Sequence, residues 1–235
     1  MGGIFNATIP STRNALNSPR SHHSNRFVYA TQPRGNDIDP KLMGMNIAIL
    51  VTDGFEQIEF TEPKKALEQE GAITKVISSK RGKVQGFHHD VKADAFDVDM
   101  TLDEADAHEF DAVLLPGGVM NSDQIRGIEA ARKLVQEVQE DGNPIAIICH
   151  GAWLPISAGL VKGRTLTSWP TLQDDIRNAG GRWVDEEVVV DQNWVSSRKP
   201  ADIPKFNEEM IRVFAEHRDQ QIGKPDKDVV GVAAS

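Results

Sequence analysis

Cysteine is almost missing from this 235-residue chain, which contains one thiol, Cys149. A single cysteine cannot form a disulfide within the chain, and this usage is typical of proteins kept in a reducing compartment. Long hydrophobic runs are missing too, since none approaches the about 20 apolar residues of a membrane-spanning helix. These absences argue against a disulfide-stabilised secreted protein and against a membrane protein, and they favour a cytoplasmic one.

Positive charge is also in short supply. The chain has 26 Lys and Arg residues against 35 Asp and Glu residues, so its formal net charge is -9. A surplus of negative charge opposes binding to nucleic acids and to membrane surfaces, so we expect neither as a partner. The adjacent residues His88 and His89 have no third ligand at a spacing typical of metal sites. We expect no metal and no organic cofactor.

The two ends of the chain differ from the part between them. Residues 1–44 contain no carboxylate before Asp37 and show no sustained hydrophobic periodicity. They are typical of a disordered extension or of a segment upstream of the folded domain, although an acid-poor, Arg-containing start also occurs in organelle-targeting peptides. Residues 219–235 are predicted to form a flexible C-terminal tail. The folded domain is therefore expected over residues 45–218.

Within that domain, short apolar runs alternate with amphipathic stretches. Strands are predicted over residues 45–51, 72–78, 110–118 and 143–151, and helices over residues 56–71, 123–142, 151–161 and 202–218. Hairpins are predicted within residues 82–100 and around "DQN" at residues 191–193. Buried strands that alternate with helices indicate an α/β fold with a mostly parallel central sheet and helices on both faces.

Groups of polar or small residues follow three of the predicted strands. They are Glu56 and Glu59 in "TDGFEQIE", Gly117 and Gly118 in "LLPGG", and Cys149 and His150 in "AIICHG". In open α/β sheets, the carboxyl ends of the strands form the crevice in which ligands bind. These residues are therefore expected to meet at one edge of the sheet.

Cys149 is expected on a sharp strand-to-helix turn, where Gly151 leaves the backbone uncrowded. The start of the following helix favours a thiolate, and the pKa of a cysteine in such a place falls to roughly 3.5–7.5. The free amides there also receive an oxyanion. A buried structural cysteine is the alternative that the local sequence leaves open.

Glu56 and Glu59 are three residues apart, so both fall on one side of the first helical turn. Acidic residues at a helix start are common because they complement the helix dipole. The functional alternative is that one carboxyl is held protonated by burial and donates a hydrogen bond to a thiolate or moves a proton. His150 is a candidate general base for Cys149, although adjacent residues on a turn need not face each other.

Four segments in this order, "MNIAILVTDGFEQIEFTEP", "FDAVLLPGG", "GNPIAIICHGAWLPISAGLVKGRTLTSWP" and "DDIRNAGGRWVDEEVVVDQNWVSSRKPADIP", resemble the ThiJ/PfpI superfamily. The similarity is greatest to its branch of PfpI-type intracellular proteases and stress proteins, and it extends over residues 45–218. It implies a flavodoxin-like sandwich, similar to class I glutamine amidotransferases, with Cys149 on a nucleophile elbow.

The resemblance also implies roles for individual residues. His150 matches the neighbour of the cysteine in a triad whose acidic member comes from an adjacent subunit, and Asp123 matches that member. The chain would then form a dimer or a hexamer. Glu59 matches a buried glutamate that contacts the cysteine, and Glu56 a second acid at the pocket. Gly117 belongs to the matching "PGG" segment, while the amides of Gly118 and His150 match the oxyanion site.

Arg198 in "SSRKPAD" matches an arginine that recurs in this branch, and we expect it to close a structural salt bridge. The amidotransferase activity of other superfamily members requires a histidine and a glutamate two residues apart late in the domain. The histidine that follows Cys149 and His150, His217, lacks this pattern.

The function implied is cysteine-dependent protection against stress, by a glyoxalase or deglycase acting on small carbonyl compounds or their protein adducts, or by an intracellular cysteine peptidase. No metal or organic cofactor is implied, and the expected partners are a small carbonyl or a peptide and further copies of the chain. A redox sensor or chaperone-like protein with an oxidisable Cys149 is the alternative, because it requires the same activated thiol.

Overall fold

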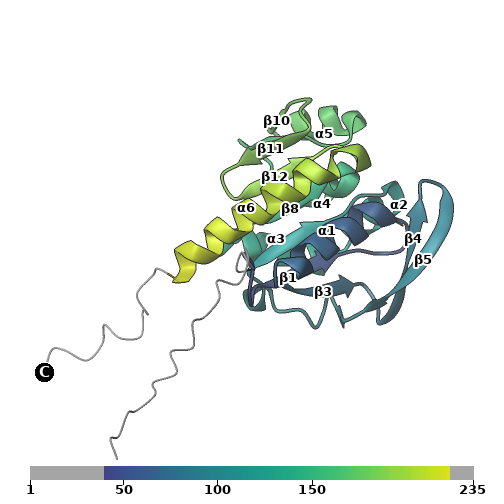
Figure 1. The fold of residues 1–235 in the computed structure, drawn as a ribbon. Helices are drawn as coiled ribbons and strands as arrows, with labels where there is room; N and C mark the ends of the chain where they lie inside the picture. Colours follow the sequence, from purple (N-terminus) through teal and green to yellow (C-terminus); the bar gives the residue numbers. More distant parts are fainter. Residues whose placement is uncertain (1–39, 223–235) are drawn as a thin grey trace, which may run out of the picture. The chain divides into compact units, whose positions relative to one another are not determined.

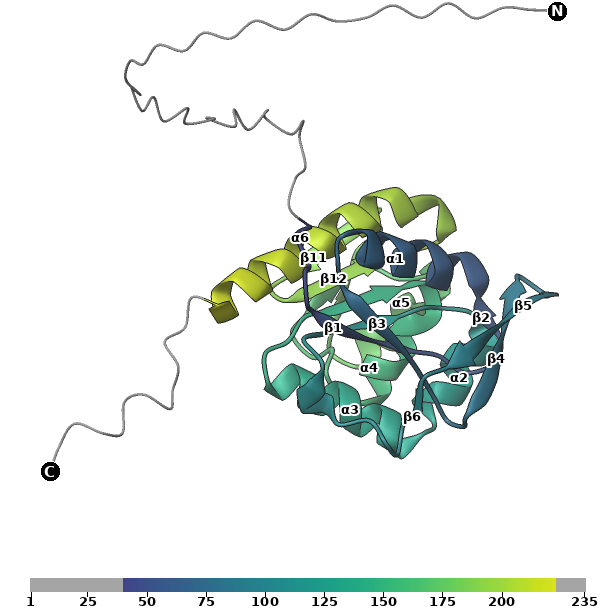
Figure 2. The same cartoon turned by 60° about the horizontal axis from the view of Figure 1, so that its bottom comes forward.

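The computed structural model describes residues 40–222 (Figures 1 and 2). The predicted extension up to residue 39 and the predicted tail from residue 223 lie outside the described residues. Residues 40–44 form a turn in which Leu42 is fully buried. The backbone N–H of Leu42 donates a hydrogen bond to the carbonyl of Glu70. At the other end the last helix continues to Ile222, four residues past the predicted end of the domain. None of the described helices is long and apolar enough to cross a membrane.

A seven-stranded sheet forms the centre of the domain, in the order β11-β12-β8-β7-β1-β3-β6. Neighbouring strands are parallel except for the β11–β12 hairpin at one edge. The strands are β1 (Asn46–Leu50), β3 (Ile73–Ser78), β6 (Met100–Thr101), β7 (Ala112–Leu115), β8 (Ile145–Ile148), β11 (Val188–Asp191) and β12 (Trp194–Ser197). This order and direction confirm the predicted mostly parallel α/β sheet, and the β11–β12 turn confirms the hairpin predicted at "DQN".

Helices cover both faces of this sheet (Figures 1 and 2). On one face lie α1 (Gln57–Gln69) and α6 (Ile203–Ile222). On the other lie α2 (Val119–Arg126), α3 (Glu129–Glu140) and α4 (Trp153–Ser157), and α5 (Gln173–Asn178) lies near the β11 edge. The 3₁₀ turns are η1 (Ala107–Glu109), η2 (Cys149–Ala152), η3 (Pro170–Leu172) and η4 (Pro200–Asp202).

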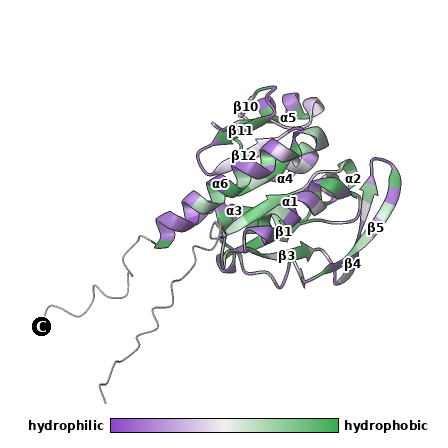
Figure 3. Ribbon diagram, in the orientation of Figure 1, coloured by the Kyte–Doolittle hydropathy of each residue, from purple (hydrophilic) through white to green (hydrophobic). Residues whose placement is uncertain are grey.

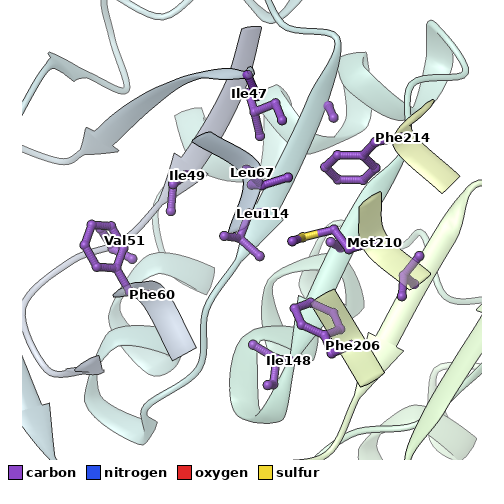
Figure 4. Close-up of a cluster of buried hydrophobic side chains, with 14 of the residues drawn as sticks. Ile47, Ile49, Val51, Phe60, Leu67, Leu114, Ile148, Phe206, Met210 and Phe214 are labelled. Atoms are coloured by element: carbon purple, nitrogen blue, oxygen red, sulfur yellow. The ribbon is translucent and has the colours of Figure 1, made fainter. Parts of the chain in front are cut away.

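Two hydrophobic clusters, one on each face, result from the two-residue period of the strands. In β1, Ile47 and Ile49 pack on the α1 and α6 side, whereas Ala48 and Leu50 pack on the α3 side. Figure 4 shows the first cluster, in which Phe206, Met210 and Phe214 of α6 lie over the sheet. In Figure 3 the strands of the central sheet are mostly green, whereas β5 is mixed and α6 is largely purple on its outer side, as expected for a buried sheet between amphipathic layers.

A separate three-stranded sheet of order β2-β4-β5 lies at the N-terminal end of α1, since β2 directly precedes that helix. It comprises β2 (Phe55–Glu56), β4 (Gly82–His88) and β5 (Val91–Val98), and β4 and β5 form an antiparallel hairpin. The hairpin predicted within residues 82–100 is thus confirmed. The short strands β9 (Thr165–Leu166) and β10 (Arg182–Trp183) form a parallel pair.

The prediction of one continuous helix over residues 123–142 is wrong. Helix α2 begins earlier, at Val119, and ends at Arg126, and α3 begins at Glu129 after an extended residue, Ile128. Glycine at position 127 weakens a helix interior, and the side chain of Arg132 donates to the carbonyl of Arg126 at 2.7 Å, which stabilises the break. The apolar spacing alone continues across the break, so periodicity could not reveal it.

Candidate active site

Cys149 stands on a sharp turn directly after β8. Its φ is +61°, a left-handed conformation that non-glycine residues rarely adopt and that is typical of functional sites. Gly151 allows this turn to pack closely, because a Cβ there would lie 2.3 Å from the carbonyl oxygen of Leu115. The side chain is buried, and the whole residue is 6% exposed. The structure therefore places the thiol where the sequence predicted, at the carboxyl end of a central strand.

Gly117 and Gly118 pass close to this turn after β7. A Cβ on Gly117 would lie 2.5 Å from Glu59 Oε2 and 2.7 Å from Cys149 Cβ, so the backbone can run here only without a side chain. Gly118 has φ of +89° and starts α2. The backbone N–H groups of Gly118 and His150 both interact with the sulfur and lower the pKa of the Cys149 thiol.

Glu59 lies in the first turn of α1 and is fully buried beside the thiol. Its Oε2 accepts a hydrogen bond from the N–H of Gly117 at 3.0 Å, whereas its Oε1 has no hydrogen-bond partner among the described residues. Burial raises the pKa of Glu59 to about 8, against the opposing effect of its interaction with Cys149. At neutral pH the carboxyl therefore keeps its proton, the state that the sequence analysis considered for an acid beside a thiolate.

The sequence-based expectation of a lowered pKa for Cys149 is wrong for this chain. Burial raises the pKa of the thiol well above its usual value, and the charge of Glu59 acts in the same direction. The amides of His150 and Gly118 act in the opposite direction but do not outweigh burial. The physical reason is that burial removes the water that would stabilise a thiolate.

His150 contacts the thiol directly, with 3.2 Å between Nδ1 and Sγ. Burial lowers the pKa of His150 to about 4, so the imidazole is neutral at neutral pH and Nδ1 is available to accept a proton. The ring lies between two indoles, at 5.2 Å from Trp153 in an edge contact and at 5.8 Å from Trp169 in a stacked one. These contacts hold the imidazole in position against the thiol, whereas the sequence alone did not determine whether the two side chains face each other.

A pocket of about 420 Å³ opens above these groups. Of the residues predicted for the site, those that line it are Glu56, Glu59, Gly118, Cys149 and His150. Gly117 lies behind them, against Glu59 and Cys149. Asp123 is exposed on α2 and does not line the pocket of its own chain.

Two other predicted residues have clear partners. Glu56 lines the pocket, as the resemblance implied. Its Oε2 accepts a hydrogen bond of 2.9 Å from the N–H of His89 and so ties the β4–β5 turn to β2. Arg198 donates to Asp202 at 2.8 Å and to Asp185 at 2.8 Å. The salt bridge expected for Arg198 is thus confirmed. The guanidinium is paired with these two carboxylates and does not line the pocket.

Sequence reasoning missed three of the polar and aromatic residues that line the pocket: His89, Asp90 and Trp169. The pair at positions 88 and 89 was considered for metal binding, yet no group of three His, Cys, Asp or Glu side chains within residues 40–222 is placed to hold a metal ion. The missed residues reach the pocket through the pairing of β2 with β4 and through the loop before η3. Neither contact has a signal in the local sequence.

Comparison with known families gives one match that spans most of the described residues. Residues 45–213 match the DJ-1/PfpI family. Among curated proteins, the chain is 44% identical to Deglycase TK1284 of Thermococcus kodakarensis over 72% of this chain and 99% of the relative. It is 39% identical to Protein/nucleic acid deglycase 2 of Escherichia coli over 73% of this chain and 99% of the relative.

Solved structures give the same result for the fold. A two-domain protein from Anabaena variabilis, with DJ-1/ThiJ/PfpI-like and ferritin-like domains, superimposes with a TM-score of 0.67 at 34% identity. The match covers 72% of this chain and 47% of that one. The flavodoxin-like α/β fold implied by the four sequence segments is thereby confirmed.

Proposed function

The chain belongs to the DJ-1/PfpI family, and on this basis we propose that it is a deglycase- or glyoxalase-type enzyme in which Cys149 adds to a small carbonyl compound or to its adduct on an amine. The observation that carries the proposal is the surroundings of the thiol. A proton donor, Glu59, a neutral base, His150, and two amides converge on one sulfur at the base of a pocket.

The chemistry begins with proton transfer, because the thiol is protonated in the free site. As Sγ of Cys149 bonds to an aldehyde carbon, its proton passes to Nδ1 of His150 at 3.2 Å. The carbonyl oxygen gains negative charge beside the amides of Gly118 and His150 and takes a proton from Glu59. The product of this step is a hemithioacetal, with Glu59 now ionised and His150 protonated.

For methylglyoxal, the next step converts the hemithioacetal into a thioester of lactate. The carboxylate of Glu59 removes the hydrogen from the thiol-bearing carbon, and a proton is returned to the adjacent carbon through an enediol. The thiol-bearing carbon is oxidised by two electrons and the adjacent carbon is reduced by two, so no external oxidant is required. Water then attacks the thioester, which releases lactate and restores the Cys149 thiol. For a carbinolamine adduct, the C–S bond forms at the former aldehyde carbon as the C–N bond breaks, and the amine takes a proton as it leaves, which gives the same hemithioacetal.

Small substrates fit the site better than folded polypeptides do. Cys149 is only 6% exposed, at the base of a pocket of about 420 Å³. A peptidase activity would require an extended chain to reach this thiol past the β4–β5 turn. We therefore rank carbonyl chemistry above the peptidase activity considered from the sequence.

The raised pKa of Cys149 also separates the enzyme from the redox-sensor alternative. Oxidation by peroxide follows the amount of free thiolate and its exposure, and both are low here. Carbonyl addition can instead remove the thiol proton in the same step, because His150 is already in contact. The arrangement supports the enzyme more directly than the sensor.

Asp123 is proposed to act in an oligomer. Its side chain is exposed on α2 and does not line the pocket of its own chain. We propose that a dimer or a hexamer brings Asp123 of one copy to His150 of another. Light scattering together with the activity of Asp123→Asn tests this point, since a fully active monomer would remove Asp123 from the site.

The proposed function is tested by methylglyoxal consumption with lactate detection. We expect lactate from the wild type, none from Cys149→Ala, and a loss of at least about a hundredfold in Glu59→Gln, typical of a lost general acid–base. Labelling of Cys149 by iodoacetamide in Glu59→Gln verifies that the thiol is still present and reactive. If the folded wild type turns over neither methylglyoxal nor an amine adduct, the proposal is wrong.

A further inference from the structure

The mouth of the pocket has a charge pattern that the proposed chemistry does not use. Among the described residues that line it, Glu56, Glu59 and Asp90 carry carboxyl groups, and none is lysine or arginine. Glu59 is protonated at neutral pH because burial raises its pKa to about 8. Two carboxylates, Glu56 and Asp90, therefore remain with no lysine or arginine in the lining to oppose them, and the basic group nearest to Glu56 there is the imidazole of His89, with 3.5 Å between Nδ1 and Oε2.

The fold holds these two carboxylates at the mouth of the pocket, where Glu56, Asp90 and Trp169 form what we call the rim. His89 and Asp90 of the turn between β4 and β5 line the pocket together with Gly118 and Val119 at the start of α2. His89 in this turn has φ of +59°, and its N–H donates to Glu56 Oε2. The Glu56 side chain is only 12% exposed, so its charge is poorly screened by water. Asp90 is exposed beside it.

An aromatic face completes the rim. Trp169 lines the same pocket, and 36% of its surface is exposed. An exposed indole attracts positively charged groups through its ring electrons. Carboxylates together with an accessible indole are the groups that bind an ammonium or guanidinium ion, and they repel a carboxylate or a phosphate.

We propose that Glu56, Asp90 and Trp169 form a charge-selective rim that admits positively charged carbonyl substrates and excludes anionic ones. The inference rests on the proposed function for its substrate class. The substrate oxygen would point to the amides of Gly118 and His150, and its positively charged part would lie at the rim. Carbonyl compounds that carry a carboxylate or a phosphate would be poor substrates, and carbonyl adducts beside an amine or a guanidinium would be favoured.

The test uses the single cysteine and does not depend on turnover. Cys149 is modified with three methanethiosulfonates of similar size, one cationic, one neutral and one anionic, and each rate constant is divided by that of free 2-mercaptoethanol. We expect the order cationic, neutral, anionic, with a cation-to-anion ratio on the order of tenfold or more at low ionic strength. High salt should reduce this ratio.

Matched variants assign the effect to the rim. Glu56→Gln keeps an oxygen for the His89 N–H and should lower the cation-to-anion ratio about fivefold, and Asp90→Asn should lower it by a smaller factor because Asp90 is exposed. The control is Asp97→Asn, since Asp97 belongs to the same hairpin but pairs with Lys83 and does not line the pocket. A change in the pKa of Cys149 alters all three rates together and cancels in the ratio.

Each outcome has a defined meaning. A ratio near one in the wild type, or a ratio unchanged in Glu56→Gln, overturns the charge-selective rim whether or not methylglyoxal is turned over. A high ratio that falls in Glu56→Gln supports the rim even if no lactate forms, in which case only the proposed reaction fails. Repeating the measurement in His89→Asn removes the imidazole at the rim, and a loss of the ratio there would assign selectivity to His89 and contradict the proposal.

Discussion

Replacing Glu59 by glutamine should change how the stability of the protein depends on pH. In the folded protein, burial raises the pKa of this carboxyl to about 8 from its ordinary value of 4.5. The unfolded chain therefore releases the proton near pH 4.5, while the folded chain keeps it up to about pH 8. Unfolding releases one proton between these limits, so the contribution of Glu59 to stability falls as the pH rises through this window.

The magnitude follows from the shift. Each pKa unit corresponds to about 1.4 kcal/mol, so the full shift of Glu59 is worth about 5 kcal/mol. Between pH 5 and pH 7 the free energy of unfolding of the wild type should fall by about 3 kcal/mol relative to Glu59→Gln. No discount for solvent screening is needed, because Glu59 is fully buried.

Urea denaturation of both proteins at several pH values between 5 and 8 measures this difference. Glutamine keeps an acceptor for the N–H of Gly117, and its amide nitrogen takes the place of the unpartnered Oε1. The resulting cost does not depend on pH, so only the slope of the difference is informative. His150 also titrates differently in the two states, but it is present in both proteins and cancels.

The control is Glu62→Gln, which changes an exposed glutamate on the same helix. Its stability should parallel that of the wild type over the whole range. The reasoning about Glu59 would be refuted if the difference between wild type and Glu59→Gln were constant with pH. That result would mean that the buried carboxyl is already ionised near its ordinary pKa.

Three further predictions concern the same chain. The imidazole of His150, whose pKa is lowered to about 4 by burial, should show no titration between pH 5 and pH 8 by NMR, and a midpoint near 6.5 would contradict the assignment. Gly117→Ala should abolish activity and lower the free energy of unfolding by about 1–3 kcal/mol, because its Cβ would lie 2.5 Å from Glu59 Oε2, whereas Gly127→Ala, with its nearest contact at 3.3 Å, should change both little. Phe206→Ala should cost about 3–5 kcal/mol in urea denaturation, since the ring is fully buried between α6 and the sheet (Figure 4); a loss below about 1 kcal/mol would contradict that packing.

Hydrophobic periodicity predicted most of the fold because it is a local property. The apolar runs before Glu56, Gly117 and Cys149 could be recognised as buried strands without knowing their neighbours. The helix over residues 123–142 was wrong because the apolar spacing continues through the break at Gly127. Whether a helix is interrupted there depends on contacts such as that between Arg132 and the carbonyl of Arg126, which only the folded chain contains.

The candidate site also depends partly on the local sequence and partly on contacts that form only in the folded chain. The sequence by itself placed Cys149, His150 and Glu59 at the carboxyl ends of strands, because parallel strands end at a common edge. Only the tertiary structure decided which groups stand around the thiol and in which protonation state. Segments distant in the sequence bring His89, Asp90 and Trp169 to the pocket.

The pKa of Cys149 is the clearest case in which the tertiary structure reverses an expectation from the sequence. Its position after a strand suggested a lowered value, yet the pKa is raised because burial by distant segments removes the water that would stabilise a thiolate. Burial and charge depend on three-dimensional surroundings, whereas residue order and periodicity depend on the chain alone. The sequence therefore determined which groups are available, and the packing determined their chemical state.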